Sequence, residues 1–217
     1  MLKRRATRVV YGPRCPLGRS TAAGFSEGVV RVTYRYLRPL TVVYARGTGP
    51  YQISCREAWG RMGGWLDQRR ARWRIKQGYG YFRDNPKLTA PDLLRYDACV
   101  PVTFGLDPEP GIGIGRQTLP GGAYAVHTHV GSYAEIGDLF SHLHREIVPQ
   151  RGLLLDYARP FVTIFLNDPS ITREMHRRTE LCVPVFPVRM PLSSNDDDAV
   201  RAGDQVSRDL TSGRLAG

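Results

Sequence analysis

Two short segments of the chain alternate apolar and polar positions with a period of two, which is typical of a strand with one buried face. In residues 180–185 the odd-numbered positions are all apolar, whereas the even-numbered positions carry Glu180 and Cys182. Residues 97–102 have the same pattern, with Asp97 in the place of Glu180. The pattern therefore predicts two similar strands, each with a core-facing side and with a carboxylate on its other side.

The similarity extends upstream of both strands and indicates an internal repeat. An Asn-Pro or Asp-Pro turn precedes each strand, and the same number of residues separates its proline from the carboxylate. Further upstream, residues 43–51 match residues 125–133. A period this long is not that of a solenoid. It predicts an α+β fold in which a strand-helix-strand-strand module occurs twice, at about residues 41–103 and 123–186.

Each module contains one helical pattern. In residues 51–70 apolar side chains recur at helical spacing with arginines between them, and residues 133–148 carry a second such pattern. Gly60, Gly63 and Gly64 weaken the first helix. In return, these glycines would allow close approach to a sheet or a ligand.

The remaining segments are predicted to be irregular. Residues 104–122 are rich in glycine and proline and are expected to link the modules. The run Gly111–Gly115 lacks the third-glycine spacing and the strand–helix setting of a dinucleotide loop. Residues 1–30 are predicted to form a poorly ordered basic arm and residues 191–217 a disordered tail, which leaves residues 31–190 as the folded domain.

Composition limits the class of protein. With 217 residues and 41% hydrophobic content the chain can bury a proper core. No apolar run approaches the length of a membrane span, and the basic start is not followed by the apolar stretch of a secretory signal. The four cysteines form no CxxC pair, which disfavours a zinc site or a redox motif. A cytoplasmic protein without membrane partners is therefore expected.

The net charge of +11 is concentrated in residues 1–76. Such a region is typical of contact with nucleic acid or another polyanion, or it is a basic arm followed by the solvated side of one helix. The second interpretation is favoured, because no DNA-reading pattern surrounds the charge. Contact of the arm with DNA is expected to be weak and nonspecific.

A series of short motifs runs through both modules: Gly49-Pro50-Tyr51, Asp84-Asn85-Pro86, residues 93–100, residues 119–126, Gly131-Ser132-Tyr133, residues 166–169 and residues 179–185. In this order and spacing they resemble the GyrI-like small-molecule-binding domains, over about residues 31–188. These domains occur alone, as in the gyrase-inhibitory protein, and fused to DNA-binding domains in bacterial activators of the AraC and MerR types. No DNA-binding domain is recognisable in this chain.

The resemblance implies a concave antiparallel sheet of two pseudo-symmetric modules with both helices on one face. It also implies a groove on the other face that takes bulky, apolar and often cationic compounds. Some members of the family hydrolyse strained cyclopropane-containing toxins, so the resemblance leaves catalysis open.

Glu180 is the leading candidate for a ligand-binding residue. A carboxylate among apolar groups loses its hydration and so becomes a partner for a cation, and in the family a glutamate at this position lies in the ligand pocket. The alternative is a surface glutamate in an ordinary ion pair. Cys182 shares its face, and Asp97, with its shorter side chain, is expected to serve structure.

Aromatic residues complete the predicted groove. Phe161 and Phe165 alternate with branched aliphatic residues that suit the helix-facing core, which leaves the aromatic rings for the ligand. Phe82 matches Phe165 in the repeat. All three are also compatible with plain core positions. Trp65, which matches a tryptophan common in the family, either borders the pocket or anchors its helix, and anchoring is favoured.

No cofactor or metal is predicted. His127 and His129 would share a strand face, and His142 and His144 lie on the next helix, but no cysteine or carboxylate completes a ligand set in sequence. A structural role is therefore expected for these histidines. No Ser/His/Asp or Cys/His catalytic grouping can be argued either.

Three functions remain open. The first is a stand-alone binding protein that senses or sequesters hydrophobic, often cationic compounds. The second is a hydrolase that opens a strained ring, with Glu180 as the residue that guides water. The third is an interaction protein that modulates DNA gyrase. The sequence does not separate the first two, because a carboxylate in an aromatic groove serves both.

Overall fold

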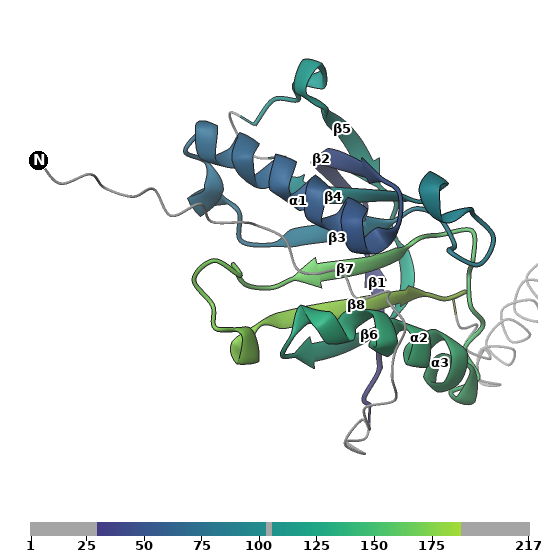
Figure 1. Ribbon diagram of the computed structural model, residues 1–217. Coiled ribbons are helices and arrows are strands. Elements are labelled where there is room, and N and C mark those ends of the chain that lie inside the picture. The colour runs from purple at the N-terminus through teal and green to yellow at the C-terminus, as the bar shows by residue number, and fades with distance from the viewer. Residues whose placement is uncertain (1–29, 103–105, 188–217) are drawn as a thin grey trace, which may run out of the picture. The chain divides into compact units, whose positions relative to one another are not determined.

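A single antiparallel sheet of eight strands forms the framework of the protein, as its computed structural model shows for residues 30–102 and 106–187 (Figure 1). The strand order across the sheet is β1-β6-β8-β7-β3-β4-β2-β5. The strands are β1 (Thr33–Leu37), β2 (Leu40–Thr48), β3 (Gly78–Phe82), β4 (Arg95–Pro101), β5 (Ile114–Leu119), β6 (Gly122–Val130), β7 (Phe161–Phe165) and β8 (Arg178–Pro184).

The order of the strands shows two modules related by pseudo-two-fold symmetry. The first module has the order β2-β4-β3 and the second the order β6-β8-β7, and they meet where β3 pairs with β7. The strand before each module joins the other module, because β1 pairs with β6 and β5 pairs with β2. Each predicted strand-helix-strand-strand repeat is thus preceded by one further strand. The two modules exchange these strands, since each pairs with the module that it does not precede.

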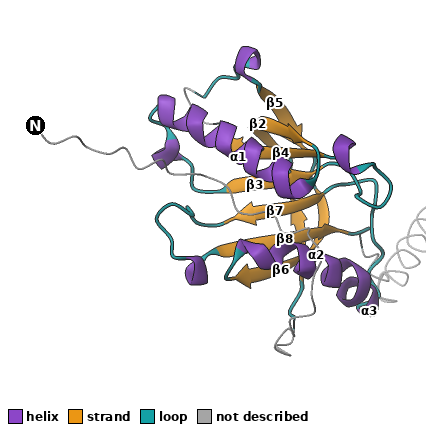
Figure 2. Cartoon of the chain, viewed as in Figure 1, coloured by secondary structure: helices purple, strands orange, loops and turns teal. Residues whose placement is uncertain are grey.

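Both helical segments cover the same face of the sheet (Figure 2). Helix α1 (Tyr51–Gln68) packs on β2 and β4. The second segment is less regular, since a 3₁₀ turn (Tyr133–Glu135) leads into α2 (Ile136–His142), a π-helical turn (Leu143–Ile147) and α3 (Val148–Gln150). The expected fold class, α+β with two helices on one face, is confirmed.

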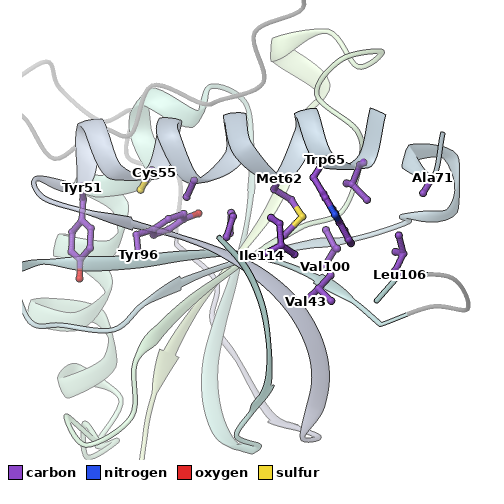
Figure 3. Close-up of a cluster of buried hydrophobic side chains, with 14 of the residues drawn as sticks. Val43, Tyr51, Cys55, Met62, Trp65, Ala71, Tyr96, Val100, Leu106 and Ile114 are labelled. Atoms are coloured by element: carbon purple, nitrogen blue, oxygen red, sulfur yellow. The ribbon is translucent and has the colours of Figure 1, made fainter. Parts of the chain in front are cut away.

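The core under α1 is formed by large apolar side chains of the helix that point at the sheet (Figure 3). Met62 and Trp65 of α1 are buried against Val43, Val100 and Ile114 of three strands. A similar cluster lies under α2, where Leu139 and Phe140 pack with Leu181 and Val183 of β8. Buried apolar side chains at helical spacing on these segments account for their attachment to the sheet.

The opposite face of the sheet is also buried and carries a third apolar cluster. Val42, Cys99, Tyr124, Val162 and Cys182 have at most 5% of their surface exposed there. Strands that are covered on both faces have apolar residues at both parities. The sequence of β7 therefore does not show which of its two faces lies under the helices.

The segments outside the two modules differ in part from the expectations. Residues 114–119, predicted as part of a linker, form the edge strand β5, whose backbone pairs with β2 along its whole length. The predicted arm at residues 1–30 and the tail at residues 191–217 lie outside the described residues, apart from Val30. Of the described helices, none combines the length and apolarity that crossing a membrane requires.

Candidate functional site

A pocket of about 620 Å³, part of it open to solvent, lies on the helix face between α1 and the second module. Its walls are mostly apolar. They are formed by Trp59, Met62 and Leu66 of α1, by Ile75 of the turn that follows, by Phe165 of β7 and by Tyr133. A concave, mostly apolar site with few polar groups is typical of small-molecule binding. We call it the α1 pocket.

Contacts between rings fix the aromatic wall of the α1 pocket. The Phe165 ring is met edge-on by Trp59, at 5.4 Å between centroids, and by Tyr133, at 5.3 Å. The indole nitrogen Nε1 of Trp59 donates a hydrogen bond of 2.8 Å to Tyr96 Oη. Gly78 makes room for the indole, since a Cβ built there would lie 2.6 Å from Trp59 Cη2. The pocket is therefore preorganised.

Tyr133 brings an unused hydrogen-bonding group to this wall. Its Oη atom is buried and has no hydrogen-bond partner among the residues that the structure describes. Burial raises the pKa of Tyr133 to about 12, so the hydroxyl stays protonated and remains a donor. A buried donor without a partner costs free energy. A ligand with an acceptor atom would recover this free energy on a small movement of the Tyr133 side chain that brings its buried hydroxyl to the pocket.

The matching tyrosine of the first module has a hydrogen-bond partner for its hydroxyl. Tyr51 occupies the position of Tyr133 in the repeat, and its hydroxyl donates a 2.6 Å hydrogen bond to the backbone oxygen of Asp84. The two tyrosines have the same place in their modules, but only Tyr133 lines the α1 pocket.

The rim of the α1 pocket is polar and carries both signs of charge. Arg72 is held by the carboxylate of Asp67 at 2.5 and 2.6 Å and donates to the backbone oxygen of Gly63. Lys76 and Asp168, which follows β7, also line the pocket. Burial lowers the pKa of Arg72 from its usual value, and the charge of Asp168 opposes this shift.

On the face of the sheet away from the helices, Asp97 is fully buried in a network of cations. Arg46 donates two hydrogen bonds to its carboxylate, at 2.7 and 3.0 Å, and Arg83 adds one of 2.9 Å. The amide of Gln117, which comes from the exchanged strand β5, adds another at 3.0 Å. This carboxylate is saturated, as expected for a residue that serves structure.

Glu180 has fewer partners than Asp97, although it occupies the same place in the repeat. In the described part of the chain its one ion pair is with Arg35 of the exchanged strand β1, at 2.5 Å. Thr128 stands opposite Glu180 where Arg46 stands opposite Asp97. The Glu180 side chain is 13% exposed and that of Arg35 is 42% exposed.

The predicted groove residues do not come together. Glu180 and Cys182 lie on the face without helices, whereas Phe82, Phe161 and Phe165 lie under the helices. The expectation that the aromatic side chains of β7 share the face of Glu180 is therefore wrong. Thr163 shares the helix face with the phenylalanines, and Val162 and Ile164 take the other face.

The other predicted site residues have clear positions. Trp65 is 2% exposed between α1 and the sheet and does not border the α1 pocket, whereas Phe165 does. Burial raises the pKa of the Cys182 thiol to about 12, which keeps it protonated and disfavours its use as a nucleophile.

Three of the histidines lie within hydrogen-bonding distance of backbone oxygens. His127 Nδ1 lies 2.9 Å from the backbone oxygen of Arg31, and His129 Nε2 lies 3.0 Å from that of Ser132. His144 Nδ1 lies 2.8 Å from the backbone oxygen of Phe140. Within the described residues no three His, Cys, Asp or Glu side chains are grouped so that they could hold a metal ion.

Trp59 and Tyr133 are the two aromatic pocket residues that the reasoning from the sequence missed. Two signals could have found them. Trp59 recurs at helical spacing with Met62 and Leu66, and Tyr133 ends the Gly131-Ser132-Tyr133 motif of the second module. Gly63, which was expected to permit close approach to a sheet or a ligand, lies in the pocket wall.

Comparison with known proteins identifies relatives of the chain. The sequence family described as GyrI-like small molecule binding domain matches residues 31–185. The probable transcriptional regulator YgiV of Escherichia coli (strain K12) is 30% identical over 109 residues, which are 50% of this chain and 67% of that protein. A protein named DNA gyrase inhibitor from Cronobacter sakazakii is 29% identical over 143 residues, 63% of this chain and 85% of that protein.

Solved structures share the fold. The C-terminal domain of EcmrR matches 74% of this chain over 100% of its own length, with a TM-score of 0.56 and 13% sequence identity. Another match is an uncharacterised conserved protein from Listeria innocua, which has a TM-score of 0.52, 13% identity, and coverage of 71% of this chain and 92% of that one. At these identities the similarity establishes the architecture.

Proposed function

Because this chain belongs to the family of GyrI-like small-molecule-binding domains, we propose that it binds hydrophobic, ring-bearing compounds in the α1 pocket. The observation that carries the proposal is the pairing of apolar walls with the buried, unpartnered hydroxyl of Tyr133. The walls remove ring surface from water, and the hydroxyl selects compounds that present an acceptor oxygen or nitrogen.

Cationic compounds are included in the proposal. The rings of Trp59 and Phe165 attract a positive charge that lies over their faces, and Asp168 supplies a carboxylate at the rim. Lys76 at the same rim opposes this preference. A compound whose charge is oriented towards Asp168 and away from Lys76 satisfies both conditions.

Sensing is the favoured use of such binding. The relative YgiV bears the name of a probable transcriptional regulator, and the Cronobacter relative that of a gyrase inhibitor. Both names refer to proteins that act on a macromolecular target. We therefore propose that the ligand of this chain modulates a contact with another macromolecule.

The Tyr133→Phe variant tests the pocket directly. It removes one oxygen that has no partner in the described protein, so stability should be unchanged or slightly higher. Affinity for a dye with a carbonyl acceptor, such as Nile red, should fall about fivefold, which corresponds to one ordinary hydrogen bond of about 1 kcal/mol. Fluorescence titration measures the affinity, and thermal unfolding measures the stability.

The matched control is Tyr51→Phe in the first module. That hydroxyl is used by the Asp84 backbone, so its loss should lower stability and leave dye affinity unchanged. Ile75→Trp should block the pocket by filling its wall with a larger ring. If Nile red binds all these variants alike and is lost only in Glu180→Gln, the ligand occupies the other face of the sheet and the proposal is wrong.

A second variant addresses the charge of the ligand. Asp168→Asn removes the rim carboxylate, and the affinity for rhodamine 6G, a cationic dye, should fall by about two- to fivefold, because exposed charge pairs contribute roughly 0.2–1 kcal/mol. The affinity for neutral Nile red should not change. An equal effect on both dyes would contradict the preference for cations.

A further inference from the structure

A cluster of positive charge surrounds an exposed tryptophan directly after α1. Residues 69–76 contain Arg69, Arg70, Arg72, Arg74 and Lys76, with Trp73 at their centre. Trp73 is 79% exposed, although tryptophan is usually among the most buried side chains by area. We call residues 69–76 the basic turn.

The basic turn is held firmly from within. Ala71 is 2% exposed, and its N–H donates to the backbone oxygen of Leu66. Arg70 adopts a φ of 50°, which is uncommon for a residue other than glycine, and its N–H donates to the backbone oxygen of Asp67. Ile75 packs on the core under α1. The outward direction of Trp73 is therefore a property of a fixed turn.

Two of the five cations are neutralised locally and two others are not. Arg69 pairs with Glu109, and Arg72 pairs with Asp67. Arg70 and Lys76 are exposed and have no acidic partner among the described residues. The guanidinium of Arg74 lies over the Trp73 ring, 5.2 Å from its centre, and so covers one face of the indole.

Neither the helix dipole nor a membrane surface accounts for both the cations and the exposed tryptophan of the basic turn. Cations beyond the last turn of a helix interact favourably with its dipole, which explains Arg69 and Arg70. The dipole gives no reason for an exposed indole. A membrane surface would need further exposed apolar side chains beside Trp73, whereas the exposed neighbours in the turn, Arg74 and Lys76, are charged.

We propose that the basic turn binds single-stranded nucleic acid. An unpaired base would stack on the Trp73 ring, and the adjoining phosphates would lie on Arg70 and Lys76. Stacking platforms combined with cations that follow the backbone are the general means by which proteins hold single strands. Trp73 and Arg70 do not line the α1 pocket, whereas Lys76 belongs to both surfaces. The inference does not depend on the proposed ligand.

The position of the basic turn next to the α1 pocket would couple nucleic-acid binding to ligand binding. Ile75 and Lys76 also border the α1 pocket, so one short segment separates the pocket from the nucleic-acid surface. A ligand that changes the position of Ile75 would change the affinity of the turn for nucleic acid.

Fluorescence anisotropy of a labelled oligothymidylate of about 15 nucleotides, close to the site sizes of known single-strand binders, tests the inference on the full chain. Trp73→Ala should weaken binding by about 5- to 150-fold, the range for one stacked base. The double variant Arg70→Ser/Lys76→Ser should reduce the slope of log affinity against log salt by about 1.4, because each single-strand phosphate contact contributes roughly 0.7.

The matched control is Arg116→Ser/Arg151→Ser, which removes two exposed arginines elsewhere and changes the net charge equally. It should leave the affinity nearly unchanged. The inference would be overturned by equal losses of affinity in both double variants or by unchanged binding in Trp73→Ala. It would also be overturned if Trp73→Ala weakened binding only to phosphatidylserine vesicles. The same measurement on Tyr133→Phe separates the two proposals, because that variant weakens ligand binding in the α1 pocket and leaves every residue of the basic turn unchanged.

Discussion

Replacement of Asp97 by asparagine is expected to lower the free energy of unfolding by about 3 kcal/mol, the low end of the range for breaking a buried ion pair. Asp97 is fully buried, and its carboxylate compensates both Arg46 and Arg83. Those arginines are about one-third exposed, at 33% and 30%, so water screens part of the loss. Denaturant unfolding should show a lower midpoint with an unchanged slope.

The pseudo-symmetry of the fold supplies the control for this variant. Glu180→Gln changes the matching carboxylate of the second module, whose partner Arg35 is 42% exposed. Its cost should be about 1 kcal/mol or less, as for other solvent-exposed ion pairs. Equal losses in the two variants would mean that the Asp97 network is no more stabilising than an ordinary surface pair.

Replacement of Gly47 by alanine is expected to cost a similar amount, about 3 kcal/mol, which is the upper end for overpacking a core. A Cβ at this position would lie 2.2 Å from the backbone oxygen of Ser54 in α1. A backbone atom cannot rotate away as a side chain can, so α1 would have to move off β2. The melting temperature should fall by roughly 6–12 °C, at about 2–4 °C per kcal/mol for a domain of this size.

Gly64→Ala provides a control of opposite sign within the same helix. A Cβ built there meets no atom within 4 Å. Alanine should therefore stabilise α1 by about 0.5–1 kcal/mol through its higher helix propensity. If Gly47→Ala were also neutral or stabilising, the close approach of α1 to β2 would not be a constraint on the fold.

The repeat could be predicted from the sequence because its signals are local. The spacing from proline to carboxylate and the apolar parity of β4 and β8 do not depend on the rest of the fold. The exchanged strand β5 left a weaker signal, since it pairs through its backbone and its exposed face carries polar residues such as Arg116 and Thr118. A strand at the edge of a sheet needs little apolar alternation.

The candidate site could be predicted only in part, because both faces of β7 are buried. Period-two reasoning separates a core face from a water face, but here Phe165 meets one core and Ile164 another. The face of β7 that lies under the helices carries Phe165, which packs against Tyr133 of its own module and against Trp59 of the other module. Such long-range contacts leave no trace in the pattern of a single strand.

The exchange of strands also orders events during synthesis of the protein. Thr33 of β1 bonds to the backbone oxygen of Val126 in β6, 93 residues further along the chain. When β1 leaves the ribosome, its partner β6 has not yet been made, and both the first module and β5 are made before β6. Of the described strands, β1 is therefore made first but is among the last to pair. Until β6 has been made, the edge of β1 is open to pairing with other strands.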